Sequence, residues 1–423
     1  ISSAQNVTLD MKGLTITTGN NLLFSNAGTF KITDSAETSG SITTTSSGGK
    51  VIENSGTLTY EKITTSGGST TIDNSGTMNI LSGSIYTSGT KVINNTGTLT
   101  MSDGELKTNA GTMVMYNSGS TEITGGTISI VGVYRGRNYG IQNTGNGILK
   151  FSGEATINGA SQEGDRTIIG IYNNATPKEG STEANVQIDG GTISVAWYNY
   201  YSDIMGYGIQ NESSTGVVTV NDGTISGGYA VINEGILNVN GGSMTGNCDS
   251  AVNNSNELNI SGGQITMNKN TWTRGYGIEN SGTIKMTSGT VTSNVIGIYN
   301  TKNVTITGGT VSGSTTGITS SGALILGTKG DLESDETTLK VSKDNPEIVS
   351  STTGISTSGT FNFYDGIIKG STAISGTVNE IEDGYEIIVS SDDTYNEIKY
   401  LYYLPIVSID DTEYYSFEEA LKN

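Results

Sequence analysis

Apolar and polar residues alternate along most of this chain, in short runs separated by glycine and small polar residues. The phrase "INNTGTLTMSDGELKT" (93–108) holds three such runs, and close copies of it begin at Ile52, Ile72, Ile278 and Ile298. A period of two is typical of β-strands, and Gly, Asn, Asp and Ser between the runs are typical of turns. The pattern therefore predicts three short strands in each repeat.

An asparagine before "SGT", or its equivalent, marks each repeat, and most steps between these markers are 20 to 22 residues. Three strands repeated in tandem at this period predict an all-β fold, a right-handed parallel β-helix, in which the strands of successive coils pair at about 4.8 Å. We expect the asparagines to form a structural ladder at one corner, each amide bonding to the next. Its predicted members are Asn54, Asn74, Asn95, Asn143, Asn211, Asn233, Asn280 and Asn300, with Asn26, Asn117, Asn174 and Asn254 at the same place in other repeats.

The apolar residues of the three runs are expected to point inward and to stack in columns, because one coil cannot bury its apolar side chains alone. The first predicted column contains Ile141, Ile171, Ile209, Ile278 and Ile298. The second contains Leu58, Met78, Leu99, Leu237 and Leu258, and the third contains Ile193, Ile225, Val291 and Val311.

Four insertions interrupt the repeat, each between the third run and the next first run, at 131–140, 159–170, 195–208 and 267–277. We expect them to form loops along one edge of the stack. Aromatic rings beside arginines suit sugars and acidic groups, so these loops are the candidate ligand-binding surface. An alternative is that the rings fold back over the coil. The candidate residues are Tyr134, Arg135, Arg137, Tyr139, Arg166, Trp197, Tyr198, Tyr200, Tyr201, Trp272, Arg274 and Tyr276.

Composition narrows the possible functions. The 423 residues carry a net charge of −20 and include no His and one Cys, Cys248. This balance argues against a nucleic-acid partner, and the lack of His argues against His-dependent triads and zinc sites. No apolar run is long enough for a membrane span, and no cofactor or metal site is predicted. The acidic segment 327–348 lacks the spacing of an EF-hand and is interpreted as a solvated loop rather than a calcium site.

A polysaccharide-cleaving enzyme is the second interpretation, because a glycosidase needs two suitably spaced carboxylates. Glu53 and Asp73 lie on neighbouring coils, but both are expected to point outward with no Arg, Trp or His near them. No other catalytic constellation is recognisable, so a non-catalytic role is favoured.

The repeat is lost from about Gly384, which predicts a β-helix over 1–383 and a small connector over 384–423. In the connector, "EIIV", "IKYLYYL" and "VSI" are expected to be strands, and Ser416 with Glu419 is expected to begin a helix. The segment "VSIDDTEYYSFEEALKN" resembles a linker of large surface proteins of Gram-positive, often gut-dwelling, bacteria. The "NSGTLTI-x-GGTI" repeats resemble the pectate-lyase-like β-helical repeats of the same proteins.

The resemblance implies an extracellular, cell-surface location and a place among neighbouring tandem domains. It carries no catalytic motif. We therefore expect an adhesin or stalk segment whose loops bind glycans or host surface proteins. The alternatives are a polysaccharide lyase or glycoside hydrolase using the same loops, and a purely structural spacer or filament subunit.

Overall fold

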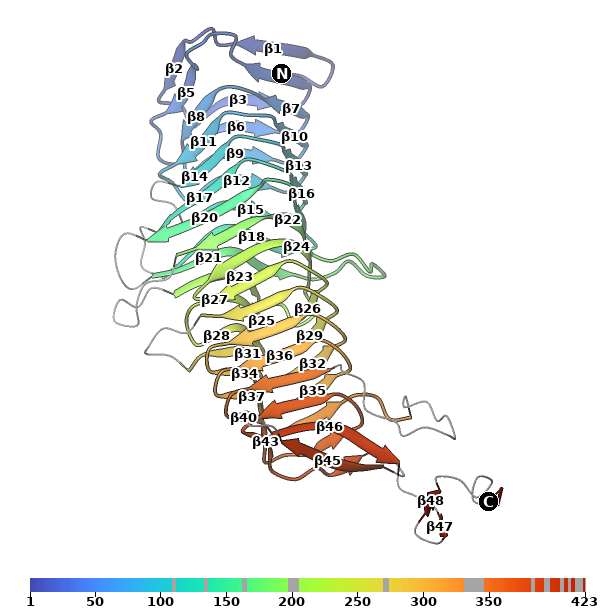
Figure 1. The fold of residues 1–423 in the computed structure, drawn as a ribbon. Helices are drawn as coiled ribbons and strands as arrows, with labels where there is room; N and C mark the ends of the chain where they lie inside the picture. The colour runs from blue at the N-terminus through green and yellow to red at the C-terminus, as the bar shows by residue number, and fades with distance from the viewer. Residues whose placement is uncertain are drawn as a thin grey trace. The chain divides into compact units, whose positions relative to one another are not determined.

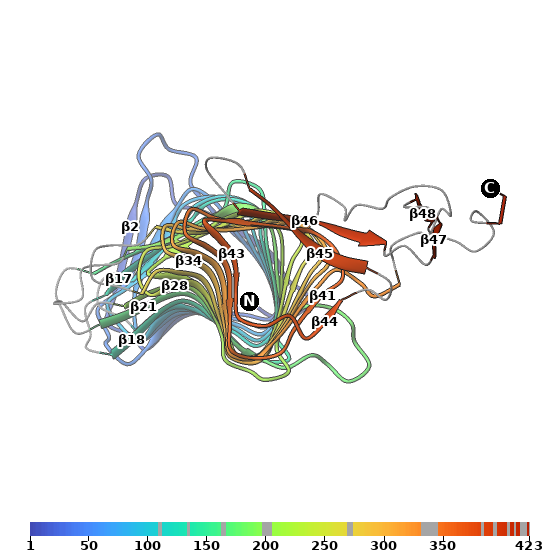
Figure 2. The same cartoon turned by 60° about the horizontal axis from the view of Figure 1, so that its bottom comes forward.

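The computed structural model describes residues 1–108, 112–132, 136–161, 166–196, 205–268, 274–330, 346–381, 385–391, 396–403, 407–409, 412–414 and 421–422. The chain forms two compact units, Ile1–Val252 and Asn253–Asn423. Each unit is a stack of parallel coils (Figure 1), and the strands of one unit that share a face overlie one another in the view of Figure 2.

Unit 1 has three faces, and each coil contributes a strand to every face. The first face consists of β3 (Leu22–Asn26), β6 (Lys50–Asn54), β9 (Thr70–Asn74), β12 (Lys91–Asn95), β15 (Met113–Asn117), β18 (Gly136–Gly145), β21 (Arg166–Ala175), β23 (Met205–Asn211) and β25 (Tyr229–Asn233). The second consists of β1 (Asn6–Asp10), β4 (Thr29–Thr33), β7 (Thr57–Tyr60), β10 (Thr77–Ile80), β13 (Thr98–Met101), β16 (Ser120–Ile123), β19 (Ile148–Phe151) and β26 (Ile236–Val239). The third consists of β2 (Thr15–Thr18), β5 (Ser41–Thr44), β8 (Thr64–Gly67), β11 (Ser84–Thr87), β14 (Glu105–Thr108), β17 (Thr127–Gly132), β20 (Thr156–Ser161) and β27 (Ser243–Gly246). Two long strands, β22 (Val186–Val195) and β24 (Val217–Gly227), belong to both the second and the third face.

Unit 2 repeats this arrangement after β28 (Ser250–Asn254), which contains the boundary between the units. Its first face consists of β31 (Tyr276–Asn280), β34 (Ile296–Asn300), β37 (Thr316–Ser320), β40 (Thr353–Thr357) and β43 (Thr372–Ser375). Its second consists of β29 (Glu257–Ile260), β32 (Thr283–Met286), β35 (Asn303–Ile306), β38 (Ala323–Leu326), β41 (Phe361–Phe363) and β44 (Glu380–Ile381). Its third consists of β30 (Gln264–Met267), β33 (Thr290–Ser293), β36 (Thr310–Gly313), β39 (Glu347–Ser350) and β42 (Ile367–Gly370).

The fold is the predicted right-handed parallel β-helix, and the apolar columns confirm it. Met78 pairs in register with Leu58 on one side and Leu99 on the other, and all three side chains are fully buried. In the third face, Ile193 pairs with Ile225 in the same way. Stacking therefore buries each apolar side chain between its equivalents in the coils before and after it.

A second inward row, made of asparagine, runs along the first face of unit 1. It contains Asn26, Asn54, Asn74, Asn95, Asn117, Asn143, Asn173, Asn211 and Asn233, each no more than 1% exposed. From Asn26 to Asn211, each amide nitrogen in the row donates to the side-chain oxygen of the next asparagine, over 2.7–2.9 Å. In unit 2, Asn254, Asn280 and Asn300 continue the pattern, and Asn300 donates to the hydroxyl of Ser320 at 2.9 Å.

One predicted member of the row was wrong. Asn173, not Asn174, pairs with Asn143 and lies in the buried row. Ile171 aligns with Ile141, and the ladder position is always two residues after this isoleucine. The turn that follows differs in length in this coil, so counting back from the turn misplaced the marker by one residue.

The insertions lie at the predicted place but are not simply loops. In unit 1, part of each extends a strand beyond the coil. Val131 and Gly132 of β17 pair with Ala160 and Ser161 of β20, and Arg137 of β18 pairs with Thr167 of β21. Neighbouring insertions support each other because their ends continue the same hydrogen-bonded sheet.

The coil pattern ends with β44, and the strands that follow are antiparallel. The predicted tail strands are present as β45 (Tyr385–Ser391), β46 (Asn396–Tyr403) and β47 (Val407–Ile409). β45 and β46 form an antiparallel pair, β46 also pairs antiparallel with β42, and β47 pairs with β48 (Thr412–Tyr414). The predicted helix start at Ser416 lies outside the described residues.

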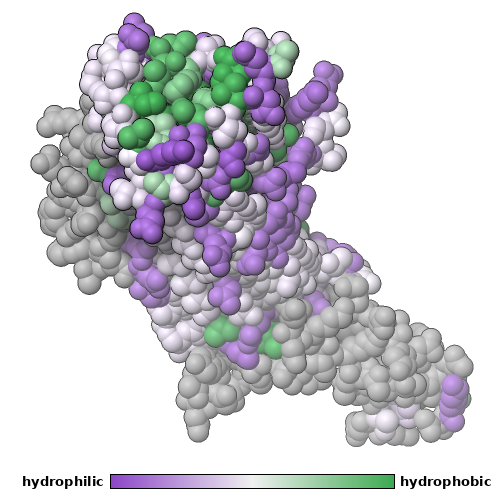
Figure 3. All heavy atoms as spheres, turned by 90° about the horizontal axis from the view of Figure 1, so that it is seen from above, coloured by the Kyte–Doolittle hydropathy of each residue, from purple (hydrophilic) through white to green (hydrophobic). Residues whose placement is uncertain are grey.

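The N-terminal end of unit 1 exposes apolar side chains. Figure 3 looks onto this end and shows a hydrophobic area. Val7, Leu9 and Ile16 are only partly buried at this end, whereas their register partners in the next coil, Phe30, Ile32 and Ile42, are at most 2% exposed. These are core positions of a coil that no described coil covers on this side.

Candidate binding surface

The outer side of the first face carries two columns of side chains, because each strand there shows the same burial pattern. In β6, Val51, Ile52 and Asn54 are buried, whereas Lys50 and Glu53 face outward. Register pairing places the first and fourth residues of every such strand in line with those of its neighbours. These two columns are the surface that any ligand of this face would contact.

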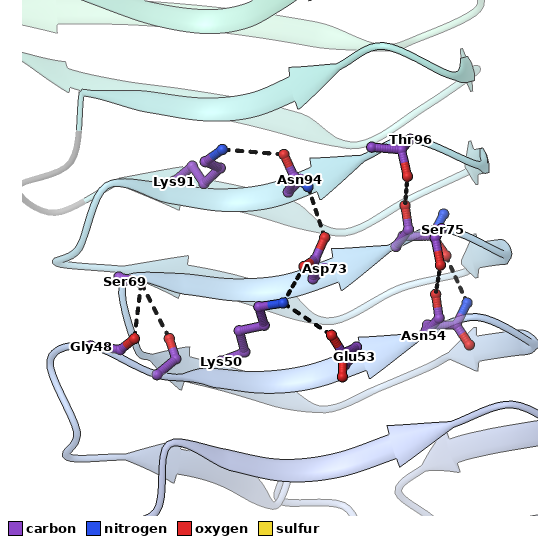
Figure 4. Close-up of polar contacts among 12 residues, drawn as sticks. Gly48, Lys50, Glu53, Asn54, Ser69, Asp73, Ser75, Lys91, Asn94 and Thr96 are labelled. Carbon is purple, nitrogen blue, oxygen red and sulfur yellow. Dashed lines mark hydrogen bonds and ion pairs between the residues drawn. The ribbon is translucent and has the colours of Figure 1, made fainter. Parts of the chain in front are cut away.

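Toward the N-terminus of unit 1 the columns are charged. The charged cluster consists of Lys50, Glu53, Asp73, Lys91 and Asn94 (Figure 4). The Lys50 ammonium bonds to Glu53 at 3.1 Å and to Asp73 on the next strand. Asn94 donates to Asp73 at 2.7 Å and accepts from Lys91 at 3.2 Å. The cluster thus links three successive coils across the surface.

The charged cluster does not fit an acid–base pair for glycoside cleavage. Such a pair needs one carboxyl that stays protonated near neutral pH. Burial alone would raise the pKa of Asp73, but its bonds from Lys50 and Asn94 outweigh burial and lower that pKa. The hydrogen bond to Asp73 raises the pKa of Lys50. Burial opposes this shift, and the hydrogen bond to Glu53 adds to it. Within the described residues, no three acidic or Cys side chains form a group that could hold a metal ion.

Toward the C-terminus of unit 1 the same columns become aromatic. The tyrosine cluster consists of Tyr116, Tyr139, Tyr172, Tyr207 and Tyr229, from β15, β18, β21, β23 and β25. The Tyr139 and Tyr172 ring centroids are 5.2 Å apart, and those of Tyr207 and Tyr229 are 5.7 Å apart in an edge-on arrangement. Five consecutive coils therefore each place one tyrosine on this surface.

Lys91 joins the two clusters, because its ammonium lies 4.8 Å from the centre of the Tyr116 ring. This distance is within the range of a cation–π interaction. The outer side of the first face in unit 1 therefore changes from charged to aromatic over adjacent strands.

An ion pair spans the tyrosine cluster. The Arg137 guanidinium lies 3.3 Å from a carboxylate oxygen of Glu212, although the two residues are 75 positions apart in the chain. Burial and the neighbouring Glu212 carboxylate raise the pKa of Tyr172 well above its ordinary value. Beside it, the side-chain oxygen of Gln210 is buried and accepts no hydrogen bond from any described residue. With its pKa raised, the Tyr172 phenol is a neutral hydrogen-bond donor at physiological pH.

Unit 2 contains a smaller version of this arrangement. Tyr276 and Tyr299, on neighbouring strands, stack with ring centroids 4.8 Å apart and planes at 9°. Arg274 lies 3.7 Å from Glu279, and Asn253 donates to the same carboxylate at 3.1 Å. As in unit 1, a tyrosine in the first column meets one in the fourth column of the next strand, with an Arg–Glu pair beside them.

Four of the candidate residues lie in these two arrangements, namely Arg137, Tyr139, Arg274 and Tyr276. Only the backbone of Arg166 is described, at the start of β21. The others lie outside the described residues: Tyr134, Arg135, Trp197, Tyr198, Tyr200, Tyr201 and Trp272. The acidic residues Asp331, Glu333, Asp335 and Glu336 also lie outside them.

Sequence reasoning missed Tyr116, Tyr172, Tyr229 and Tyr299, which belong to the regular repeats rather than to the insertions. Their place within the repeat could have identified them as outward-facing residues. Tyr172 and Tyr299 occupy the variable place in "GIYN", between an inward isoleucine and an inward asparagine. Alternation alone places that residue on the outer side of the strand.

Comparison with protein-family models, with curated protein sequences and with solved structures gives no match to this chain. The part of the chain that the structure describes also contains no helix that is long and apolar enough to cross a membrane.

Proposed function

We propose that this chain is a non-catalytic binding segment of a bacterial cell-surface protein, and that unit 1 binds an extended glycan along its tyrosine cluster. The observation that carries the proposal is the run of tyrosines on β15, β18, β21, β23 and β25. Rings repeated at the strand spacing, about 4.8 Å, suit a polymer with a repeat of similar length.

The chemistry of the surface favours a carbohydrate. Tyrosine offers an apolar ring face together with a hydroxyl, which matches the mixed apolar and hydroxyl surface of a sugar. Arg137 and Glu212 stand beside the rings as a charge-balanced pair. This combination selects neither strongly anionic nor strongly cationic polymers.

An extracellular location follows from the same proposal and from the resemblance of the repeats to bacterial surface proteins. A chain with 41 acidic and 21 basic residues presents a hydrophilic, self-repelling surface, which suits an exposed solenoid. Neighbouring domains of the same protein would be its structural partners.

A purely structural spacer is the second candidate, and one observation favours it. Tyr172 is only 7% exposed, and it packs against Tyr139. Rings that cover each other stabilise the stack and offer less area to a ligand. Tyr139, Tyr207 and Tyr229 are only partly buried, which favours the binding role.

A glycan array with the whole chain and three variants tests the proposal. The variants are Tyr139→Ala/Tyr207→Ala, its conservative counterpart Tyr139→Phe/Tyr207→Phe, and Leu81→Ala, an exposed apolar side chain between β10 and β11, as a control. We expect the alanine pair to weaken binding about ten-fold or more, since each ring contributes roughly 0.5–1.5 kcal/mol. The phenylalanine pair keeps the ring faces and should retain most of the affinity.

Urea unfolding of each variant separates lost binding from lost folding. Binding that is equally strong in the wild type and the alanine pair, with both folded, would contradict the tyrosine surface. If the wild type binds no glycan but captures a host matrix protein, the ligand class is wrong. If it binds neither, the spacer role stands.

A further inference from the structure

Unit 1 contains a recess at the corner between the third and first faces, on the N-terminal side of the insertions. It has a volume of about 360 Å³ and is formed by three successive coils. Thr43, Ser66 and Tyr86 line it from β5, β8 and β11, and the turns that follow these strands contribute Ser47 and Ser88.

The recess exists because of the order of side chains in one outward column. Thr43 pairs in register with Ser66, and Ser66 pairs with Tyr86. Two small side chains are thus followed by a large ring, so the ring forms a wall beside space that the small residues leave open. The hydroxyls of Thr43 and Ser66 are 3.0 Å apart and bond to each other, which fixes the floor.

Glycine keeps the turn clear. Gly67 has a φ of 100°, and a Cβ added there would come within 2.1 Å of the Thr44 carbonyl oxygen. Gly68 follows with a φ of 75°. The two residues therefore turn the chain at the edge of the recess without side chains that would fill it.

The lining determines which ligands fit. Every lining residue is Ser, Thr, Gly or Tyr, so the recess has no formal charge. Hydroxyl groups both donate and accept hydrogen bonds, and a tyrosine ring packs against apolar C–H groups. The volume is at the lower end of ligand pockets, which span roughly 300–1,000 Å³, and it limits the occupant to a small molecule.

We propose that this recess is a second binding site, which takes one neutral sugar ring with Tyr86 against its apolar face. The site is separate from the tyrosine cluster, and the proposal stands whether or not that cluster binds a glycan. Thr43, Ser66 and the turn serines provide hydrogen bonds to the sugar hydroxyls. The sugar is either free or the last residue of a longer chain.

Saturation-transfer NMR on the whole chain tests the site. The probes are methyl glycosides of glucose, galactose and N-acetylglucosamine, with glucuronic acid and glucosamine as charged counterparts and a neutral trisaccharide as the chain-end form. The variants are Tyr86→Ala and Tyr86→Phe, with Leu81→Ala, an exposed apolar side chain between β10 and β11, as the control outside both sites. Tyr86 is only partly buried, so its truncation leaves the core intact.

We expect at least one neutral glycoside to bind, and its affinity to fall about ten-fold in Tyr86→Ala. Tyr86→Phe and Leu81→Ala should stay within about three-fold of the wild type. A trisaccharide that binds more tightly through its terminal ring identifies the chain-end form, and equal affinity identifies the free sugar. The proposal is overturned if no neutral probe binds, if charged counterparts bind equally well, or if Tyr86→Ala binds as the wild type does.

Discussion

At the scale of single residues, the buried asparagines place polar amide groups in an otherwise apolar interior, where hydrogen bonds to their neighbours satisfy them. Asn95 accepts from Asn74 and donates to Asn117, and it also bonds to the carbonyl of Ser120. Its neighbour Asn94 faces outward and bonds to Asp73. The same residue type therefore has two energetically different roles at adjacent positions.

Replacing Asn95 with Ala should destabilise unit 1 by about 1–3 kcal/mol, because it removes several hydrogen bonds and leaves a small void among buried groups. Asn94→Ala is the matched control and should cost no more than about 1 kcal/mol. Urea titration followed by circular dichroism measures both. Equal losses in the two variants would show that the buried row is no more important than the surface.

The ion pair between Lys50 and Asp73 should make the stability of unit 1 depend on pH. The pKa of Asp73 is lowered in the folded chain, so its contribution is complete above the unfolded pKa, near 4, and is lost as the pH falls through the folded pKa. Lys50 stays charged throughout this range, because its pKa is raised. The free energy of unfolding of the wild type should be higher than that of Asp73→Asn at pH 6, by less than about 1 kcal/mol, and this difference should shrink below pH 4.

The measurement is the urea midpoint of both proteins from pH 6 to pH 3. Glu53 pairs with the same ammonium, so Glu53→Gln is a useful comparison. A difference between wild type and Asp73→Asn that is constant over the whole range would exclude the Asp73 carboxylate as its source.

At the scale of strands, the sequence predicts the coil well and the insertions poorly. Alternation and the asparagine markers place Ile141, Ile171 and Ile209 in one column, because each coil must match its neighbours. The error at Asn174 arose where a turn changes length. The strand extensions at Val131 and Arg137 depend on pairing between neighbouring insertions, which no local pattern reveals.

The candidate surface was predicted only in part, for a related reason. Arg137 and Tyr139 stood out because they interrupt the repeat. Tyr172 did not stand out, because it lies within a regular repeat. Its contact with Tyr139 runs diagonally between neighbouring strands. Such contacts follow only from the register of the folded coils. Arg137 and Glu212 lie two coils apart, so nothing in the sequence around either residue predicts their ion pair.

At the scale of the whole molecule, the net charge of −20 should oppose folding through repulsion among like charges. Salt screens this repulsion, since the Debye length falls from about 30 Å at 0.01 M to about 3 Å at 1 M. We expect the melting temperature to rise by about 2–5 °C between 10 mM and 500 mM sodium chloride. A fall would mean that cross-coil ion pairs such as Lys31 with Glu61 outweigh the repulsion.

The asparagine row has a consequence for how such a chain can change over time. Successive members of the row are separated by as few as 20 residues, from Asn54 to Asn74, and by as many as 38, from Asn173 to Asn211. The hydrogen bond between neighbours is the same in both cases, at 2.7 Å and 2.8 Å. The hydrogen bond between two successive asparagines thus does not depend on the length of the segment that connects them. Insertions, deletions and substitutions in the corner segments should therefore leave the register of the scaffold unchanged, so that different surfaces can be built on the same frame.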